Sequence, residues 1–234
     1  MVHNVPMRLV LASASPARRA TLIAAGISPI VKVSTVDEDA VLASLPGGRA
    51  LTGGATTPAD EVGALAEAKC ADVCAALAQG DPELPPGERA LVVGCDSMLE
   101  IGGQMLGKPH TPDVARERIA AMRRQTATLW TGHSAALLVS SRADRWLVDR
   151  QVTASASTLV HFGDISDAEI NAYVATGEPL NVAGSFTVDG LGGPFIDGVT
   201  GDYHSVVGIS LPLLRAMAQE LGVFWPDLWD APRA

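Results

Sequence analysis

The sequence has little of several features that would place it in a common functional class. It contains three cysteines in 234 residues, without the spacing of a zinc site, so neither a disulfide framework nor a zinc-stabilised fold is expected. This cysteine content favours a reducing cytoplasm. No apolar run approaches the roughly 18 residues of a membrane span, and the run after Arg8 is too short for a secretory signal. We therefore expect no membrane partner.

Positive charge is also scarce. The formal net charge of −9 argues against a nucleic-acid partner, which would select a basic surface. None of the five histidines has metal-ligand spacing, and no Gly-x-Ser-x-Gly elbow, Walker loop or dinucleotide fingerprint occurs. Nucleophilic catalysis by serine, cysteine or histidine therefore has little support. Of three lysines, two fall inside the motifs described below, Lys69 and Lys108.

The chain does have enough apolar material for one large domain. With 47% hydrophobic and 18% charged residues it can bury a sizeable core, and we expect a single domain over residues 1–234. Helix and strand signals mix without a clean βαβ rhythm, which predicts an α/β fold with a mixed twisted sheet in two lobes around a central cleft. Helices are expected at 16–25, 58–78, 111–123, 166–177 and from 211, strands at 9–11, 91–95, 127–140 and 146–162, a hairpin at 98–106, and Gly/Pro-rich loop insertions near 44–57 and 79–89.

A helix start directly follows the first predicted strand. Ser15 is a suitable N-cap, and Pro16 suits the first helical position. A helix N-terminus offers free N–H groups and partial positive charge to an anion, and the arginines Arg18 and Arg19 match phosphate oxygens in bidentate geometry. With Ser13, these residues predict a phosphate-binding turn. The alternative is an ordinary capped helix with solvated arginines.

Four further positions carry charge where phosphoryl chemistry could use it. Lys69 lies on the apolar stripe of the 58–78 helix, where it either snorkels from the edge or points into an anion site. Asp96 stands at the end of an apolar strand, as a catalytic carboxylate or an Asx-turn residue. Glu38 belongs to an acidic cluster that follows a β-like run at 29–36 and either holds a divalent cation or is a solvated loop. With Lys108, which a proline follows, these groups favour metal-assisted phosphoryl chemistry.

Eight short motifs then occur in one order along the chain. They are Ser13-x-Ser15-Pro16-x-Arg18, Asp37-Glu38, Leu65-Ala66-x-x-Lys69, Gly94-x-Asp96-Ser97, Leu106-Gly107-Lys108-Pro109, Thr131-Gly132, Ala183-Gly184-Ser185-Phe186 and Val206-Val207-Gly208. Each is weak alone, but together they resemble the Maf-like nucleotide pyrophosphatases over nearly the whole chain.

This resemblance implies a fold similar to that of inosine-triphosphate pyrophosphatases. It implies hydrolysis of a nucleoside triphosphate, canonical or modified, between its α and β phosphates, with Mg²⁺ or Mn²⁺ as cofactor, and it suggests a homodimer and the clearing of non-canonical nucleotides. By position, the phosphate ligands would be Ser13, Ser15, Arg18, Lys69 and Lys108. Glu38 and Asp96 would hold the metal, and Asp96 would also accept the proton of the attacking water.

The chain departs from the family pattern where substrates are selected. Ala17 replaces an arginine that follows the proline in many members, and Asp189 replaces a glutamine of the pyrimidine-preferring branch. The run around Asp189 is closer to the branch associated with 7-methyl-GTP, so Asp189 is the candidate base-reading residue. Two alternatives stay open: a phosphatase that cleaves a different phosphate bond, and a non-catalytic nucleotide sensor acting in septum formation and cell-division arrest.

Overall fold

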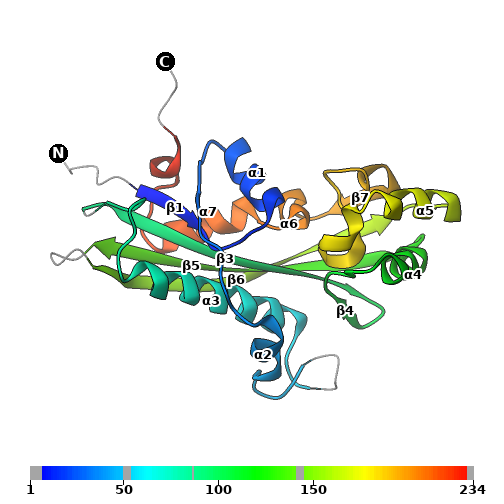
Figure 1. Ribbon diagram of the computed structural model, residues 1–234, viewed down its shortest axis with the longest axis horizontal. Coiled ribbons are helices and arrows are strands. Elements are labelled where there is room, and N and C mark those ends of the chain that lie inside the picture. The colour runs from blue at the N-terminus through cyan, green and yellow to red at the C-terminus, as the bar shows by residue number, and fades with distance from the viewer. Residues whose placement is uncertain (1–6, 50–53, 86, 141–144, 231–234) are drawn as a thin grey trace.

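A single mixed sheet runs through the whole molecule. The computed structural model describes residues 7–49, 54–85, 87–140 and 145–230, and its strands form one seven-stranded sheet (Figure 1). The sheet order is β2 (Ile30–Val31), β1 (Met7–Leu11), β3 (Arg89–Ile101), β5 (Thr126–Ser140), β6 (Trp146–Phe162) and β7 (Ile196–Thr200), with β4 (Gln104–Leu106) paired to the end of β3. β1 is parallel to β2 and β3, and the other pairs are antiparallel. The predicted mixed α/β fold is confirmed. Residues 50–53 and 86, inside the two predicted loop insertions, lie outside the described residues.

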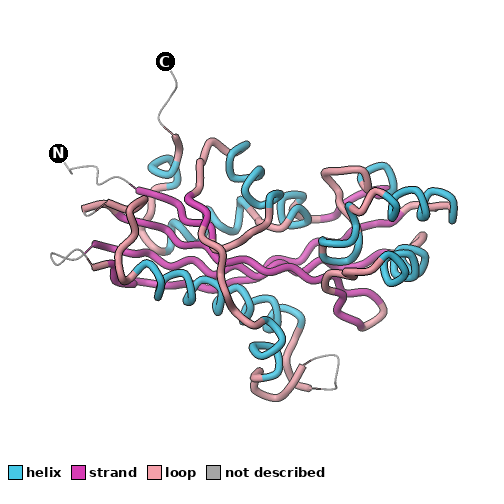
Figure 2. The backbone as a smooth tube through the Cα atoms, in the orientation of Figure 1, coloured by secondary structure: helices cyan, strands magenta, loops and turns pink. Residues whose placement is uncertain are grey.

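Helices cover both faces of this sheet. α3 (Pro58–Leu77) lies along one face, and α1 (Pro16–Ala24), α6 (Tyr203–Val207) and α7 (Leu211–Glu220) cover the other (Figure 1). α4 (Pro112–Met122) and α5 (Asp167–Ala175) gather at the end that carries β4 and β7, together with the single-turn helices η2 (Glu178–Asn181), η3 (Ala183–Ser185) and η4 (Gly193–Phe195). α2 (Glu38–Ala43) projects beside α3, and η5 (Trp225–Leu228) follows α7, as the tube in Figure 2 shows. Among the described residues, no helix is both long and apolar enough to cross a membrane.

Strand alternation explains how one sheet carries helices on two faces. Successive side chains point to opposite sides of a strand. Leu9 and Leu11 therefore pack toward α1 and α7, whereas Val10 between them packs toward α3. A further cluster at the other end of the long strands includes Leu99 and Phe162 and joins α4 to α5. The central strands β1, β3 and β5 are thus buried on both faces along most of their length, whereas much of β6 is exposed.

The sequence located most helices through their caps. Ser15, Thr57 and Ser166 are the N-caps of α1, α3 and α5, and the last two belong to complete capping boxes. α4 begins at Pro112 and α7 at Leu211, each within one residue of the predicted start. The two long strands β5 and β6 also begin within one residue of their predicted positions.

Two local predictions were wrong. The strand predicted to end before Asp96 continues to Ile101, because β3 pairs with β5 without interruption. The β-like run 29–36 forms only the short strand β2, and the acidic cluster after it starts α2, with Asp37 as the N-cap. The length of β3 is decided by its partner β5, which local sequence does not report, whereas α2 begins at the local N-cap Asp37.

Candidate functional site

One edge of β3 is open at its middle. β1 pairs with residues 89–93 of β3 and β4 pairs with residues 99–101, so no described strand neighbours residues 94–98 on that edge. The last bond between the parallel strands runs from the Ala12 amide to the Val93 carbonyl at 2.8 Å. There the chain leaves the sheet and turns into α1. Ser13 and Asp96 both lie at this opening, and both are buried.

The serine turn is held by Arg18. The Ser13 Oγ accepts the Ser15 amide at 3.2 Å and an Arg18 Nη1–H at 3.0 Å. The Arg18 guanidinium also donates to the carbonyls of Gly208 and Cys95, at 2.8 and 2.9 Å, and to the Ser97 hydroxyl at 3.1 Å. Four of its five N–H groups therefore have internal partners. Arg18 joins α1, β3 and α6 into one rigid unit.

Lys69 bridges two carboxylates beside this turn. Its Nζ lies 2.6 Å from Asp96 Oδ1 and 2.7 Å from Glu38 Oε1. The Lys69 and Asp96 side chains are 12% and 10% exposed, so their ion pair is shielded from water, whereas Glu38 is half exposed. Lys69 therefore does not snorkel to solvent but is paired with two carboxylates. That it also faces a substrate anion stays a prediction.

The environment separates the pKa values of the two carboxyl groups. Burial raises the pKa of Asp96 above its ordinary value, although the charges of Lys69 and Arg18 act against the rise. Burial also acts to raise the pKa of Glu38, but there the hydrogen bond and charge of Lys69, with the charges of Lys108 and Arg18, outweigh it and the pKa is lowered. A carboxyl group with a raised pKa is suited to accept a proton, and one with a lowered pKa stays an anion.

Two glycines let Lys69 reach Asp96. A Cβ at Gly94 would lie 2.3 Å from the Ala66 carbonyl oxygen of α3, and a Cβ at Gly132 would lie 2.1 Å from the Val62 carbonyl oxygen. Both distances are far below any ordinary contact, so only glycine allows α3 to lie this close to β3 and β5. These glycines stand in two of the sequence motifs, which gave no reason for them.

Lys108 approaches the same site from β4. It is exposed, and no described residue pairs with it, but its charge contributes to the lowered pKa of Glu38. The preceding Gly107 carbonyl accepts the Arg118 guanidinium at 2.8 Å and the Gly184 amide at 3.3 Å. The loop that carries Lys108 is therefore anchored on both sides, while its ammonium group is left free.

Asp189 stands apart from these groups. It is exposed, on a loop whose Leu191 and Gly192 amides donate to the Glu178 carboxylate at 3.1 and 3.2 Å. Glu178 also accepts a hydrogen bond from the Thr187 hydroxyl, so this loop is anchored to η2. Among the described residues, no hydrogen bond or ion pair joins Asp189 to the Lys69 cluster. The structure thus brings together the predicted phosphate and metal residues but not the predicted base-reading residue.

Sequence reasoning missed the polar residues beneath Arg18. The Ser97 hydroxyl hydrogen-bonds the Thr131 hydroxyl at 3.1 Å, and Thr131 in turn donates to the Ser205 carbonyl at 3.0 Å. His133, fully buried, accepts the Ser210 amide on Nε2 at 2.8 Å, and burial together with the Arg18 charge lowers its pKa to about 4. The available signal was the occurrence of polar residues inside otherwise apolar strands.

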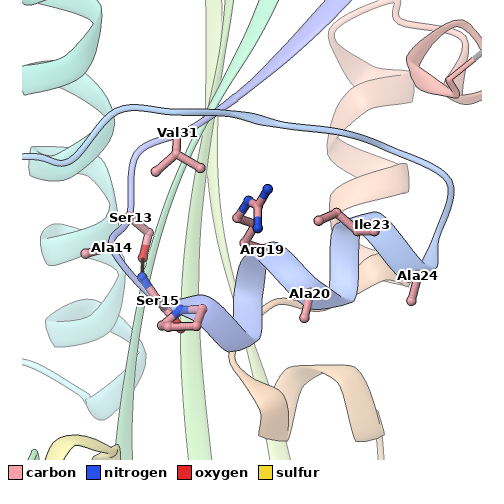
Figure 3. A pocket seen from close by; sticks show the side chains of 9 residues that line it. Ser13, Ala14, Ser15, Arg19, Ala20, Ile23, Ala24 and Val31 are labelled. Carbon is pink, nitrogen blue, oxygen red and sulfur yellow. Dashed lines mark hydrogen bonds between the residues drawn. The ribbon is translucent and has the colours of Figure 1, made fainter.

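A cavity of about 510 Å³ adjoins the serine turn. Figure 3 shows Ser13 and Ser15 at one end of it, with Arg19 and Ile23 projecting from α1 toward Val31 of β2. Arg19 is exposed and, among the described residues, has no hydrogen-bond or ion-pair partner for its side chain.

Comparison with known proteins gives a consistent picture. The family model described as "Maf-like protein" matches residues 8–221. A protein of Nocardia farcinica named "Nucleoside triphosphate pyrophosphatase" is 50% identical over 96% of this chain and 97% of its own length. Proteins of the same name from Rhodococcus jostii and Streptomyces coelicolor are 49% and 48% identical, over 94% and 95% of this chain and 95% and 94% of their own lengths.

Proposed function

The chain belongs to the family of Maf-like proteins, and from this premise we propose that it is a nucleoside triphosphate pyrophosphatase that hydrolyses the bond between the α and β phosphates. The products are a nucleoside monophosphate and pyrophosphate. The observation that carries the proposal is the largely buried side chain of Lys69, whose ammonium group lies between two carboxylates beside the serine turn. Cations that face an anionic substrate, next to a carboxyl group of raised pKa, are what phosphoryl hydrolysis needs.

The carboxylates of Glu38 and Asp96 suit a divalent cation. Each places one oxygen within 2.7 Å of the same Lys69 nitrogen, so a single positive centre can already be shared by both. Mg²⁺ and Mn²⁺ prefer such oxygen ligands and need only one or two of them when substrate phosphates supply the rest. The described residues hold no group of three or more His, Cys, Asp or Glu side chains arranged around a metal, which agrees with a cation that is completed by the substrate. When bound, the cation neutralises developing charge on the phosphate oxygens.

Side chains of the protein carry out the proton transfer and stabilise the charge of the phosphates. Asp96, with its raised pKa, takes the proton of the attacking water as the α–β bond breaks and pyrophosphate leaves. Lys69 and Lys108 counter the charge of the phosphates, and Lys108 is free to move toward them. Ser13 and Ser15 bind the phosphates at the turn before α1, and the hydrogen bonds of Arg18 hold that turn in place.

Base selection is proposed to lie at Asp189. An ionised carboxylate only accepts hydrogen bonds, so it favours a base edge rich in N–H donors, as guanine or 7-methylguanine offers. This loop is tied to α5 and Glu178, whereas the Lys69 cluster lies on α3 and β3, so different elements would bind the base and the phosphates. We place the enzyme in the cytoplasm, which the three buried free cysteines favour, and expect a homodimer.

A panel of canonical and modified nucleoside triphosphates with Mg²⁺, assayed separately for pyrophosphate and for inorganic phosphate, tests this function. Pyrophosphate with a nucleoside monophosphate is the expected result. Release of inorganic phosphate with a diphosphate would instead identify a phosphatase. Tight nucleotide binding without any product would favour a nucleotide sensor in cell-division arrest.

A further inference from the structure

The three residues after Pro16 differ in the charge that they can offer to a ligand. Ala17 carries no charge. Arg18 carries charge, but its guanidinium is bonded to Gly208, Cys95, Ser13 and Ser97, which leaves a single N–H free. A guanidinium held this way cannot turn to grip a phosphate with two parallel hydrogen bonds. The free cation of α1 is therefore Arg19.

Arg19 faces the cavity that begins at the serine turn. It lies one helical turn after Ser15, and side chains four residues apart share a helix face. The same face carries Ile23, and Val31 of β2 lies across the cavity, so an apolar wall lies beside the guanidinium (Figure 3).

The charge of Arg19 is also left unpaired. Arg8, Arg116, Arg123, Arg124 and Arg150 each form an ion pair with a carboxylate. Arg89, Arg118, Arg145 and Arg215 form none with the described residues, and of these four none lines the cavity beside the serine turn. Among the described residues, none pairs with Arg19. Two serines and an available guanidinium around a cavity of about 510 Å³ form a site suited to an oxyanion.

We propose that Arg19 and this cavity receive the terminal phosphate of the substrate and hold the pyrophosphate product until it leaves. The inference rests on the proposed function. Arg18 joins the Ser13 hydroxyl to the Cys95 carbonyl, directly before Asp96. With the base toward residues 187–192 and the α–β bond at Asp96, the serine turn is therefore the side that we assign to the terminal phosphate. Residues 187–192 are tied to the end of the sheet with α5, whereas the cavity lies between α1 and β2. Arg19 thereby favours triphosphates over monophosphates.

Titration calorimetry with the two products tests this assignment. Inorganic pyrophosphate, and separately guanosine and uridine monophosphates, are titrated with Mg²⁺ into the wild type, Arg19→Ala, Arg19→Lys and Arg215→Ala. Arg215 is a matched control, since it is an exposed arginine of α7 on the same face of the sheet. Loss of a charged hydrogen bond weakens binding about ten- to hundredfold. We expect that loss for pyrophosphate in Arg19→Ala, partial recovery in Arg19→Lys, and unchanged binding of the monophosphates in every variant.

Kinetics supply the second readout. Arg19→Ala should raise KM for a triphosphate by a similar factor and leave kcat within about twofold, because the contact is made before and during the reaction alike. The inference is overturned if Arg19→Ala binds pyrophosphate as the wild type does, if Arg215→Ala loses as much, or if the wild type binds no pyrophosphate. A wild type that binds pyrophosphate but releases none from any nucleotide would refute the proposed function and leave Arg19 assigned to an anion site.

Discussion

Replacing Gly94 with alanine tests how closely α3 must approach the sheet. The new Cβ would lie 2.3 Å from the Ala66 carbonyl oxygen and 2.8 Å from the Cys70 amide nitrogen. Both are helix backbone atoms, which cannot turn aside as a flexible side chain can. Ordinary contact distances return only if α3 and β3 separate by about 1 Å.

This separation should reduce both stability and turnover. Overpacking of a core costs about 1–3 kcal/mol of the free energy of unfolding. Lys69 lies on α3 between the two contacts, so the shift also carries its Nζ away from Asp96 Oδ1, now 2.6 Å distant. A misplacement of about 1 Å in a catalytic group can cost about 10²-fold in rate. We expect losses of that order in kcat for Gly94→Ala, measured as pyrophosphate release, together with a lower Tm.

Gly63→Ala is the matched control on the same helix. Its Cβ would meet the Ser155 Oγ at 3.6 Å and the Thr153 Cγ2 at 3.8 Å, which are ordinary contacts. Alanine is a better helix former than glycine by about 0.5–1 kcal/mol, so this variant should be slightly more stable and fully active. A Gly94→Ala protein as stable and active as the wild type would refute the close-approach argument. So would a Gly63→Ala protein that is equally damaged.

Three further outcomes are expected. Asp96→Asn should lower kcat by about 10²–10⁴-fold with an unchanged circular dichroism spectrum, and a variant that keeps more than about a tenth of the rate would remove Asp96 from the mechanism. Excess chelator should abolish pyrophosphate release and added Mg²⁺ or Mn²⁺ should restore it, whereas full activity in chelator would contradict a cation at Glu38 and Asp96. His133 has a folded-state pKa of about 4, below the ordinary 6.5, so the unfolded chain takes up its proton first and stability is lost as the pH falls from 6.5 toward 4. Denaturant titrations should show a fall of about 3 kcal/mol that is absent in His133→Gln, and equal pH dependence in the two proteins would disprove this assignment.

The sequence predicted the elements whose signals are local. Caps and prolines marked the starts of α1, α3 and α5, and Gly102 and Gly103 marked the turn between β3 and β4, where both adopt positive φ. The position of Lys69 on the apolar stripe also followed from helical periodicity alone. Short-range signals were sufficient there, because the deciding interactions lie within one or two turns of the chain.

The rest depends on contacts between distant residues. Asp96 lies in the middle of β3 because β5 pairs on beyond it, and nothing near Asp96 in the sequence reports that partner. The role of Arg18 depends likewise on a distant residue, because its guanidinium donates to the carbonyl of Gly208, which is 190 residues away. Sequence spacing made both arginines candidates for phosphate, and only the packing of α6 separates their roles.

The topology of the sheet gives a physical reason for that separation. Residues 94–98 of β3 lack a strand neighbour on one edge among the described strands, so the Cys95 carbonyl there has no backbone partner. A buried carbonyl without a partner costs about 1–3 kcal/mol, and Arg18 Nη1 satisfies it at 2.9 Å. Arg18 thus completes the open edge of the sheet where β1 departs. The same opening in the sheet lies beside the Lys69–Asp96 pair. The site and the role of Arg18 therefore have one structural origin. Because Arg18 is needed to satisfy the sheet edge, we assign phosphate binding to its neighbour Arg19.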